Sequence, residues 1–302
     1  MIRPLPLNHV LAVRDMNRGL LDDLFVQARA YAESGHADRV AGKGQGKIVA
    51  TLFFQPSTRT RLSFESAAAR LGSKCLACAD GATMRAGSAW HESLSDTAKV
   101  VSSYADLVVI RHGSPDAARE YANSSSIPVV NAGDGTEHPT QAMVDLLTLK
   151  TELGRLDGLS VMVAGDLTQR CVRSFVLGLS MYQAARIILV AHPGKDLDSA
   201  SKAKAISSGA TVLQMERIAE GVDQVDAIYM AGMNDPADAP LPAHQLDAQM
   251  LGSCAVPPVV LHPLPRGIEL PKSLDDLPNS AYFRQSANAV SLRMALILSL
   301  LR

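Results

Sequence analysis

The chain has 302 residues, of which 47% are hydrophobic and 20% are charged. This balance excludes a disordered chain, and the length predicts two domains that each bury a core. With 29 basic residues against 30 acidic ones, there is no basic excess to hold nucleic acid or an anionic membrane surface. Four cysteines are too few for a disulfide framework, and no apolar run reaches the ~18–20 residues of a membrane span. We therefore expect a cytoplasmic protein with no nucleic-acid partner and no membrane partner.

Short uncharged apolar runs alternate along the chain with amphipathic stretches. The runs predict nine β-strands, at 48–53, 75–78, 107–110, 128–131, 160–164, 187–190, 211–215, 227–230 and 259–262. Helices are predicted at 62–71, 94–104, 140–152 and 172–184, and a last helix is predicted at 288–301. Runs without charge are typical of parallel strands covered on both faces, so the alternation indicates a doubly wound α/β architecture.

One break interrupts this alternation, in the segment 151–158, where a long predicted helix ends and a new unit begins with a strand. The break predicts two domains, each built on a doubly wound parallel sheet. The first domain comprises residues 1–150 with 286–302, and the second comprises residues 151–285. The last helix has no strand after it, so we expect it to pack back on the first domain.

Hydroxyl and guanidinium groups follow the first predicted strand, at the start of a helix. They belong to Ser57, Thr58, Arg59 and Thr60. Free backbone N–H groups and the positive end of the helix dipole favour a phosphate at such a position. The hydroxyls add hydrogen-bond donors, and Arg59 adds a forked positive charge. An ordinary helix N-cap needs only one such residue, so four consecutive donors predict a phosphate site.

Three further polar clusters follow other predicted strands. Arg111 ends the third strand, at the edge where ligands of open α/β sheets bind. His138 and Gln141 follow the fourth strand and stand three residues apart at the start of a helix. Residues 262–266, with the sequence His-Pro-Leu-Pro-Arg, form a rigid turn after the last strand. Each cluster alone also fits a structural role, as a surface arginine, a helix-capping histidine or a proline turn.

Together these clusters resemble the signatures of the aspartate/ornithine carbamoyltransferase family. The matching segments are Ser-Thr-Arg-Thr-Arg at 57–61, His-Pro-Thr-Gln at 138–141 and His-Pro-Leu-Pro-Arg at 262–266. The last segment is similar to the aspartate branch, because the ornithine branch has a cysteine within that turn. The resemblance covers essentially the whole chain and implies the carbamoyltransferase fold. It also implies transfer of a carbamoyl group from carbamoyl phosphate to an amine, with release of phosphate.

The resemblance assigns a role to each cluster. Four residues are implied to bind the phosphate: Ser57, Thr58, Arg59 and Thr60. Three are implied to be catalytic, donating to the carbonyl oxygen where negative charge builds: Thr60, Arg111 and His138. Three are implied to hold the carbamoyl NH2: Gln141 and the main-chain carbonyls of Leu264 and Pro265. No metal or cofactor is implied. The partners implied are carbamoyl phosphate, a small amine or amino-acid acceptor, and further copies of the chain in a homotrimer with shared active sites.

The residues implied to bind the acceptor depart from the family pattern. Arg170 matches an arginine that follows the Gly-Asp-Leu turn, although the turn is one residue shorter here. Gly232 stands where the aspartate branch has a second arginine, and Asn234 stands at a glutamine. Trp90 stands at a lysine of the loop that the neighbouring subunit donates, which is about 82–92 here. Two positive charges are therefore missing at the acceptor end, and Gly232 is expected to widen the pocket.

Three explanations of this departure stay open. The acceptor can lack a second carboxylate, with Trp90 as an apolar or cation–π wall. Alternatively, Arg85, His91 or Arg173 can compensate, and the acceptor is then aspartate, as in pyrimidine biosynthesis. Finally, the chain can be a non-catalytic scaffold or regulatory paralogue. The complete set of donor-binding residues disfavours this last explanation.

Overall fold

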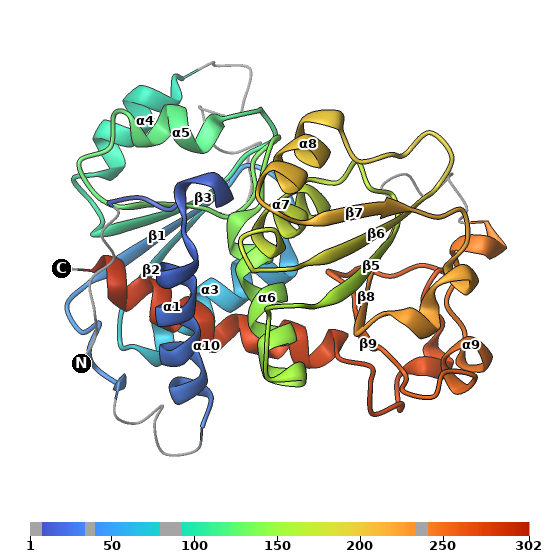
Figure 1. Ribbon diagram of the computed structural model, residues 1–302. Coiled ribbons are helices and arrows are strands. Elements are labelled where there is room, and N and C mark those ends of the chain that lie inside the picture. Colours follow the sequence, from blue (N-terminus) through green and yellow to red (C-terminus); the bar gives the residue numbers. More distant parts are fainter. Residues whose placement is uncertain (1–7, 34–39, 79–91, 234–240, 302) are drawn as a thin grey trace. The chain divides into compact units, whose positions relative to one another are not determined.

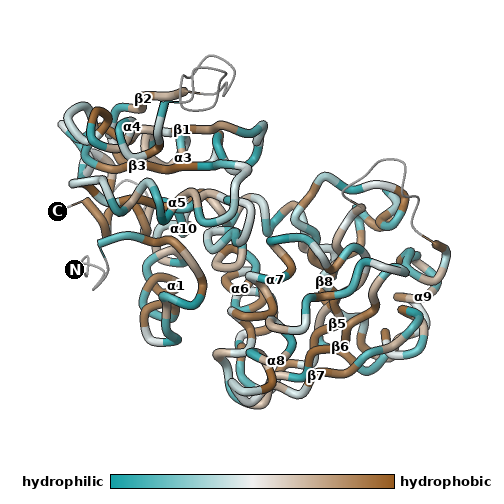
Figure 2. Tube along the Cα trace, turned by 90° about the horizontal axis from the view of Figure 1, so that it is seen from above, coloured by the Kyte–Doolittle hydropathy of each residue, from teal (hydrophilic) through white to brown (hydrophobic). Residues whose placement is uncertain are grey.

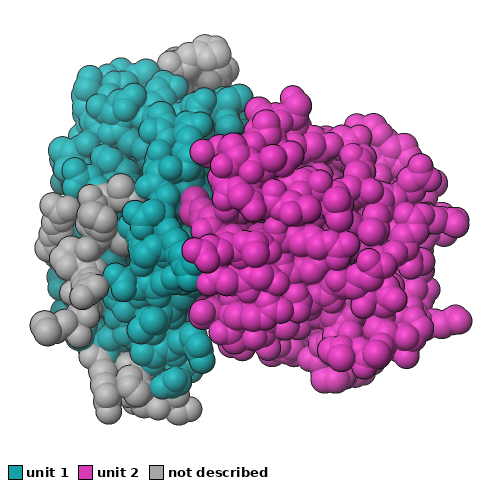
Figure 3. Space-filling model, in the orientation of Figure 1, with its two compact units in different colours: residues 1–140, 287–302 teal, residues 141–286 magenta. Residues whose placement is uncertain are grey.

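The computed structural model describes residues 8–33, 40–78, 92–233 and 241–301. The chain forms two compact units, Met1–Thr140 with Ala287–Arg302 and Gln141–Ser286 (Figure 3). Each unit has its own parallel sheet with helices beside it (Figure 1), which confirms the predicted α/β class. The division falls within the continuous helix α6 (Pro139–Leu153). This helix begins one residue before the predicted segment 140–152 and ends one residue after it. The domain boundaries at 150 and 286 stay a prediction.

The sheet of the first unit has four parallel strands in the order β2-β1-β3-β4. Their bounds are Lys74–Cys78 for β2, Ile48–Phe53 for β1, Leu107–Arg111 for β3 and Val129–Asn131 for β4. In the register of the sheet, Phe53 lies opposite Arg111 and Ile110 lies opposite Asn131. The segments that follow β1, β3 and β4 therefore leave the sheet at the same edge, where open α/β sheets bind ligands.

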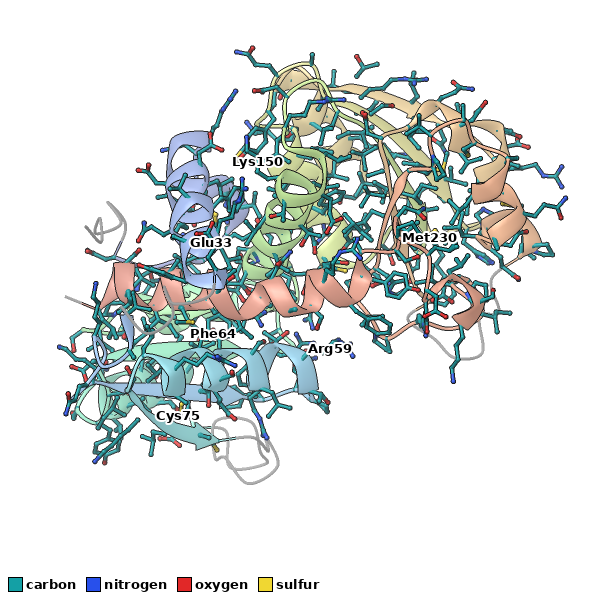
Figure 4. All side chains as sticks on the ribbon, turned by 90° about the horizontal axis from the view of Figure 1, so that it is seen from below. Glu33, Arg59, Phe64, Cys75, Lys150 and Met230 are labelled. Atoms are coloured by element: carbon teal, nitrogen blue, oxygen red, sulfur yellow. The ribbon has the colours of Figure 1, made fainter. Side chains whose placement is uncertain are left out.

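The helices within the first unit are α1 (Arg18–Ala32), α3 (Thr58–Arg70), α4 (Leu94–Val101) and α5 (Ala117–Ala122). Along α3, the apolar residues Phe64, Ala67 and Ala68 recur at helical spacing and are fully buried. The later part of α10 (Tyr282–Leu300) belongs to the same unit. The guanidinium carbon of its Arg293 lies 4.6 Å from the ring centroid of Phe64, which is labelled in Figure 4. This cation–π contact joins the C-terminal helix to α3.

The second unit has five parallel strands in the order β7-β6-β5-β8-β9. Their bounds are Thr211–Gln214 for β7, Arg186–Ala191 for β6, Ser160–Gly165 for β5, Ala227–Ala231 for β8 and Val259–Leu261 for β9. Its further helices are α7 (Arg170–Leu179), α8 (Ser199–Ser207) and α9 (Ala248–Gly252). Hydrophobic residues run along β5 and β6 in Figure 2, as expected of strands covered on both faces.

All nine predicted strands are present, and each of their ends lies within one residue of the prediction. The prediction of burial on both faces is wrong for β2 and β7, whose residues are mostly exposed. Each of them lies at one edge of its sheet, whereas the opposite edge strands β4 and β9 are buried and form bridges to further segments of the chain. The last helix begins at Tyr282 rather than at 288, and four helices have no counterpart among the predicted elements: α1, α5, α8 and α9. In the described ranges, no helix combines the length and the apolar character that a membrane crossing needs.

Candidate functional site

The first turn of α3 presents backbone N–H groups at the ligand-binding edge of the first sheet. Ser57 has the extended conformation of an N-cap, but its side chain makes no capping hydrogen bond. The N–H groups of the first turn have no partners within the helix itself. Thr60 is buried, and Arg59 lies beside it at the N-terminal end of α3 (Figure 4). An uncapped first turn with hydroxyls and a guanidinium beside it suits an anion.

Arg59 and Arg61 lie in the same helix but differ in their electrostatic surroundings. Arg61 Nε lies 3.4 Å from Glu65 Oε1, so its charge is balanced by an i,i+4 ion pair. Among the residues that the structure describes, no carboxylate pairs with Arg59. Partial burial lowers the pKa of the Arg59 guanidinium, a shift that an anionic ligand would reverse. Arg59 is therefore the cation of this turn that is available to a phosphate.

Arg111 and His138 contact each other beside Gly133. Arg111 Nη1 lies 3.5 Å from His138 Nε2 and 3.3 Å from the carbonyl oxygen of Ala132. A guanidinium can only donate, so Nε2 of His138 is the acceptor in this contact. Gly133 has a φ of +108°, and a Cβ there would lie 2.9 Å from Arg111 Nη1. A glycine is therefore needed at 133 for the arginine and the histidine to meet.

Buried polar groups hold the turn that precedes His138. Asn131 Oδ1 accepts a hydrogen bond from the Gly133 N–H at 2.8 Å, and its Nδ2 donates to Asp134 Oδ2 at 3.0 Å. Asp134 Oδ1 in turn accepts from the Glu137 N–H at 2.9 Å. The sequence assigns no role to these residues, because their partners are known only once the chain is folded. They fix the path of the backbone into His138.

The register of the sheet brings the first turn of α3 and the Arg111–His138 contact to the same edge of the first sheet. Phe53 pairs with Arg111, and the Phe54 N–H donates to the Arg111 carbonyl oxygen at 2.9 Å. The chain then enters α3 at Thr58. Arg111 ends β3, and the predicted phosphate-binding residues 57–60 and His138 follow the neighbouring strands β1 and β4 of the first unit.

A buried His262–Glu269 pair fixes the turn after β9. His262 Nδ1 accepts from the Leu264 N–H at 2.7 Å, which leaves Nε2 to donate to Glu269 Oε1 at 3.1 Å. Glu269 Oε1 also accepts from the Gly267 N–H at 2.6 Å. Burial alone would raise the pKa of Glu269, but these hydrogen bonds lower it below its usual value. Glu269 is a residue that sequence reasoning missed, and its only signal is an acidic residue shortly after the proline turn.

The arginine of the same turn has a structural partner. Arg266 donates to both carboxylate oxygens of Asp275, and its Nη2 lies 2.8 Å from Oδ2. The Tyr282 hydroxyl donates to Asp275 Oδ1 at 2.6 Å. The hydrogen bonds from Arg266 and Tyr282 lower the pKa of Asp275 to about 2. Arg266 therefore ties the turn to the segment before α10, and the carbonyls of Leu264 and Pro265 lie on a backbone fixed at both ends.

The residues implied to bind the acceptor are only partly described. Arg170 begins α7, at the turn that follows β5. Arg173, one of the expected compensating cations, donates from Nε to Asp198 Oδ2 at 2.9 Å, so its charge is already balanced. The other residues named for the acceptor lie outside the described residues: Arg85, Trp90, His91 and Asn234.

Gly232 does not open a space in the second unit. A Cβ at this position would lie 3.1 Å from both Glu269 Oε1 and the Pro265 carbonyl oxygen. The expectation that Gly232 widens a pocket is therefore wrong in this structure, because the Glu269 carboxylate already occupies the position beside it. What stands next to Gly232 is a buried negative charge.

Comparisons with known proteins agree over both units. Residues 8–151 match the family model described as aspartate/ornithine carbamoyltransferase, carbamoyl-P binding domain. Residues 157–300 match the model described as aspartate/ornithine carbamoyltransferase, Asp/Orn binding domain. The chain is thus similar to this family in both of its units.

Individual relatives extend this similarity to nearly full length. The chain is 34% identical to the aspartate carbamoyltransferase catalytic subunit of Methanocaldococcus jannaschii, over 98% of this chain and 98% of the relative. It is 35% identical to the chloroplastic aspartate carbamoyltransferase of Arabidopsis thaliana, over 99% of this chain and 79% of the relative. A solved aspartate transcarbamoylase from Trypanosoma cruzi, in complex with carbamoyl phosphate and aspartate, has a TM-score of 0.88. The sequence of that structure is 29% identical to this chain, and the alignment covers 100% of this chain and 98% of the chain in that structure.

These matches cover the segments whose geometry is described above, in the first unit and in the second. They confirm the prediction of a carbamoyltransferase from the three signature segments. The chain belongs to the aspartate/ornithine carbamoyltransferase family.

Proposed function

We propose that the chain transfers the carbamoyl group from carbamoyl phosphate to the amine of an amino acid and releases phosphate. The observation that supports this most directly is the meeting of Arg111 with His138 at the sheet edge that also carries the first turn of α3. A phosphate-binding turn beside two potential donors suits the displacement of phosphate from an acyl phosphate. The relative from Trypanosoma cruzi binds carbamoyl phosphate and aspartate, which supports the same substrates here.

The phosphate end of the donor would be held by the first turn of α3. The N–H groups of this turn and the hydroxyls of Ser57, Thr58 and Thr60 would donate to the phosphate oxygens. Arg59 would add a charge-assisted hydrogen bond, and the N-terminal end of the helix dipole favours the same negative charge. The departing phosphate can accept the proton that the attacking amine loses, so the reaction balances without a separate base.

The carbonyl oxygen gains negative charge when the amine attacks the carbamoyl carbon. Arg111 would donate to this oxygen, together with Thr60 and His138. A positioned donor of this kind is worth ~3–4 kcal/mol in the transition state. Because Nε2 of His138 accepts from Arg111 here, its own donation to the substrate requires the tautomer with a proton on Nε2.

The carbamoyl NH2 group would be recognised by hydrogen-bond acceptors. The side-chain oxygen of Gln141 and the carbonyl oxygens of Leu264 and Pro265 are candidates for this role. All three lie in the second unit, two of them on the turn that His262 and Glu269 hold. Acceptors of this kind select a donor with an NH2 group over one with a methyl group at the same place.

Replacing Arg59 with alanine should weaken carbamoyl phosphate binding by about 10- to 100-fold, because one charge-assisted contact to the phosphate is lost. Arg61→Ala is the matched control, since Arg61 lies two residues further along α3 and pairs with Glu65. Titration calorimetry with carbamoyl phosphate and with inorganic phosphate measures both variants. Equal losses in the two variants would contradict the assignment of the phosphate to the first turn of α3.

Aspartate is the acceptor that the relatives support. Those named above are aspartate carbamoyltransferases, and their similarity extends over both units. Arg170, at the start of α7, is the described cation proposed to bind an acceptor carboxylate. The acceptor must also be a small amino acid whose amine can reach the carbamoyl carbon.

A second candidate is an acceptor that lacks the side-chain carboxylate of aspartate. The observation that favours it is the Glu269 carboxylate beside Gly232, at the position implied to hold a cation in the aspartate branch. A negative charge at this place would repel a second acceptor carboxylate unless a cation separates them. An acceptor with a neutral or positively charged side chain would meet a favourable partner instead.

A panel of amino acids distinguishes these two acceptors. The wild-type chain is incubated with carbamoyl phosphate and with aspartate, asparagine, alanine, ornithine or diaminopropionate, and the carbamoylated amine is detected by mass spectrometry. If aspartate is the acceptor, we expect the kcat/KM measured with aspartate to exceed the kcat/KM measured with each other amino acid by at least about tenfold. Faster turnover of a neutral or cationic amino acid would select the second candidate, and no product with any amine would favour a scaffold.

The homotrimer with shared active sites stays a prediction. Its support is the resemblance and the exposed edge strand β2, whose Leu76 is 45% exposed and which precedes the implied donated loop. An edge strand with exposed apolar residues is a common place for contact between chains.

A further inference from the structure

A buried carboxylate in the second unit links two segments that are far apart in the sequence. Asp145, on α6, is fully buried. Its Oδ1 accepts a hydrogen bond from Gln141 Nε2 at 2.7 Å and another from Gln285 Nε2 at 2.6 Å. Gln285 lies on α10 and is also buried. One oxygen atom therefore receives two side-chain amides, and the proposed reaction gives Asp145 no role.

The hydrogen bonds fix which way each amide faces. Gln285 Oε1 accepts from the backbone N–H of His262 at 2.9 Å, so its NH2 group must face Asp145. The Asp145 oxygen accepts from Gln141 in the same way, and the opposite orientation would place two acceptors against each other. The amide nitrogen of Gln141 is therefore held at Asp145, and its oxygen is directed elsewhere.

The same network reaches the turn after β9. The His262 N–H donates to Gln285, and the His262 ring accepts from the Leu264 N–H at 2.7 Å. Asp145 thus stands between Gln141 and the turn that carries the carbonyls of Leu264 and Pro265. Gln141, Leu264 and Pro265 are the three groups proposed above to receive hydrogen bonds from the carbamoyl NH2.

We propose that Asp145 is a positioning residue for recognition of the carbamoyl NH2 group. By holding the Gln141 amide nitrogen, it leaves the Gln141 oxygen as an acceptor for that group. Through Gln285 it also holds the start of the turn that carries the two main-chain acceptors. This inference rests on the proposed function, because it assigns a part of the donor to these residues. It assigns Asp145 to the selection of carbamoyl phosphate over acyl phosphates without an NH2 group.

Acetyl phosphate is a matched probe for this role. It has a methyl group where carbamoyl phosphate has an NH2 group and is otherwise similar in shape. The methyl group cannot donate a hydrogen bond, so acceptors that require one would be left unpaired. The ratio of the dissociation constants of acetyl phosphate and carbamoyl phosphate therefore reports NH2 recognition. The affinity for inorganic phosphate reports the rest of the donor site.

The experiment compares wild type with Asp145→Leu, which removes the acceptor and keeps a branched side chain with the same number of heavy atoms. We expect wild type to prefer carbamoyl phosphate over acetyl phosphate by at least about a hundredfold. Asp145→Leu should lower this preference by about tenfold or more, because Gln141 can then turn its amide, while the affinity for inorganic phosphate changes less than about twofold. Thr148→Val is the control, since Thr148 is buried on the same helix and donates to the Val144 carbonyl oxygen at 2.8 Å. It should keep the wild-type preference.

Asp145→Asn covers the case in which the leucine variant does not fold, as judged by circular dichroism and thermal unfolding. Asparagine has the same shape, but it can face Gln141 with oxygen or nitrogen, so we expect the preference to fall by about threefold. If the leucine variant folds and keeps the wild-type preference, the role of Asp145 is overturned, while the proposed function stands. If the leucine variant does not fold, the same conclusion follows from an asparagine variant that keeps the wild-type preference. Failure of wild type to bind carbamoyl phosphate would overturn the proposed function and this inference with it.

Discussion

Replacing Arg111 with alanine should lower the kcat of carbamoyl transfer by about 100- to 1,000-fold. The reason is that Arg111 is held at the end of β3, beside His138, where its guanidinium can donate to the carbonyl oxygen as negative charge builds. A donor that acts mainly in the transition state changes kcat more than it changes substrate binding. Steady-state kinetics with carbamoyl phosphate and the preferred acceptor measure both parameters.

Arg119→Ala is the control for this variant. Arg119 lies in the same unit, on α5, and its Nη2 lies 2.8 Å from Asp15 Oδ2, so its guanidinium is paired with a carboxylate. Its loss should leave kcat within about twofold of wild type, because its pair with Asp15 has no part in the proposed reaction. If Arg111→Ala kept more than about one tenth of the wild-type kcat, the proposed stabilisation of the carbonyl oxygen would be wrong.

Gly165→Ala should destabilise the chain by at least about 4 kcal/mol. Gly165 ends β5 with a φ of +114°, and a Cβ there would lie 1.9 Å from the carbonyl oxygen of Ala231 on the neighbouring strand β8. Two atoms cannot approach so closely, so β5 and β8 would have to separate at their carboxyl ends. The midpoint of urea unfolding, followed by circular dichroism, measures the loss.

The matched control for this variant is Gly209→Ala. Gly209 has a φ of +96°, but a Cβ there would meet no atom within 4 Å. It carries the backbone penalty without the collision, so we expect a loss of only ~1–2 kcal/mol. Equal losses in the two variants would mean that the backbone conformation of Gly165, and not its approach to Ala231, is what excludes a side chain.

The parts of the fold that follow local patterns could be predicted from the sequence. The strand β1 is an uncharged apolar run, and the polar residues after it, from Ser57 to Thr60, identify the start of α3. The predicted burial of β2 was wrong because burial depends on the order of strands and on what covers each edge: β2 is an exposed edge, whereas the edge strand β4 is buried and bridges to Val10. That order depends on contacts between distant segments, and a single run of residues does not contain it.

The same limit applies to the candidate site. The end of the third predicted strand and the segment 138–141 predicted the donors at 111 and 138, and the structure places these two side chains in contact. Glu269 could not be predicted, because its importance comes from His262 and from its position beside Gly232. In the sequence, Asp145 is one polar residue within a predicted helix. Gln285 is 140 residues away along the chain, and only folding brings it into hydrogen-bond contact with Asp145.

The acceptor end shows why a missing charge is hard to interpret from sequence. Gly232 predicted extra space, since glycine has no side chain, yet the Glu269 carboxylate lies beside that position. Among the described residues, what lies beside Gly232 is a carboxylate rather than open space. Which acceptor fits this arrangement is a question of charge, and the amino-acid panel answers it by comparing anionic, neutral and cationic side chains.

The most direct test of carbamoyl transfer follows the carbamoyl carbon itself. Wild-type protein is incubated with isotope-labelled carbamoyl phosphate and an amino acid, and the label is followed by nuclear magnetic resonance. We expect the label to appear in a carbamoylated amine in equal amount to the phosphate released, at a rate that is proportional to protein concentration and at least about 100-fold lower in Arg111→Ala. Label that appears only in the products of spontaneous carbamoyl phosphate breakdown, at the rate seen without protein, would contradict carbamoyl transfer.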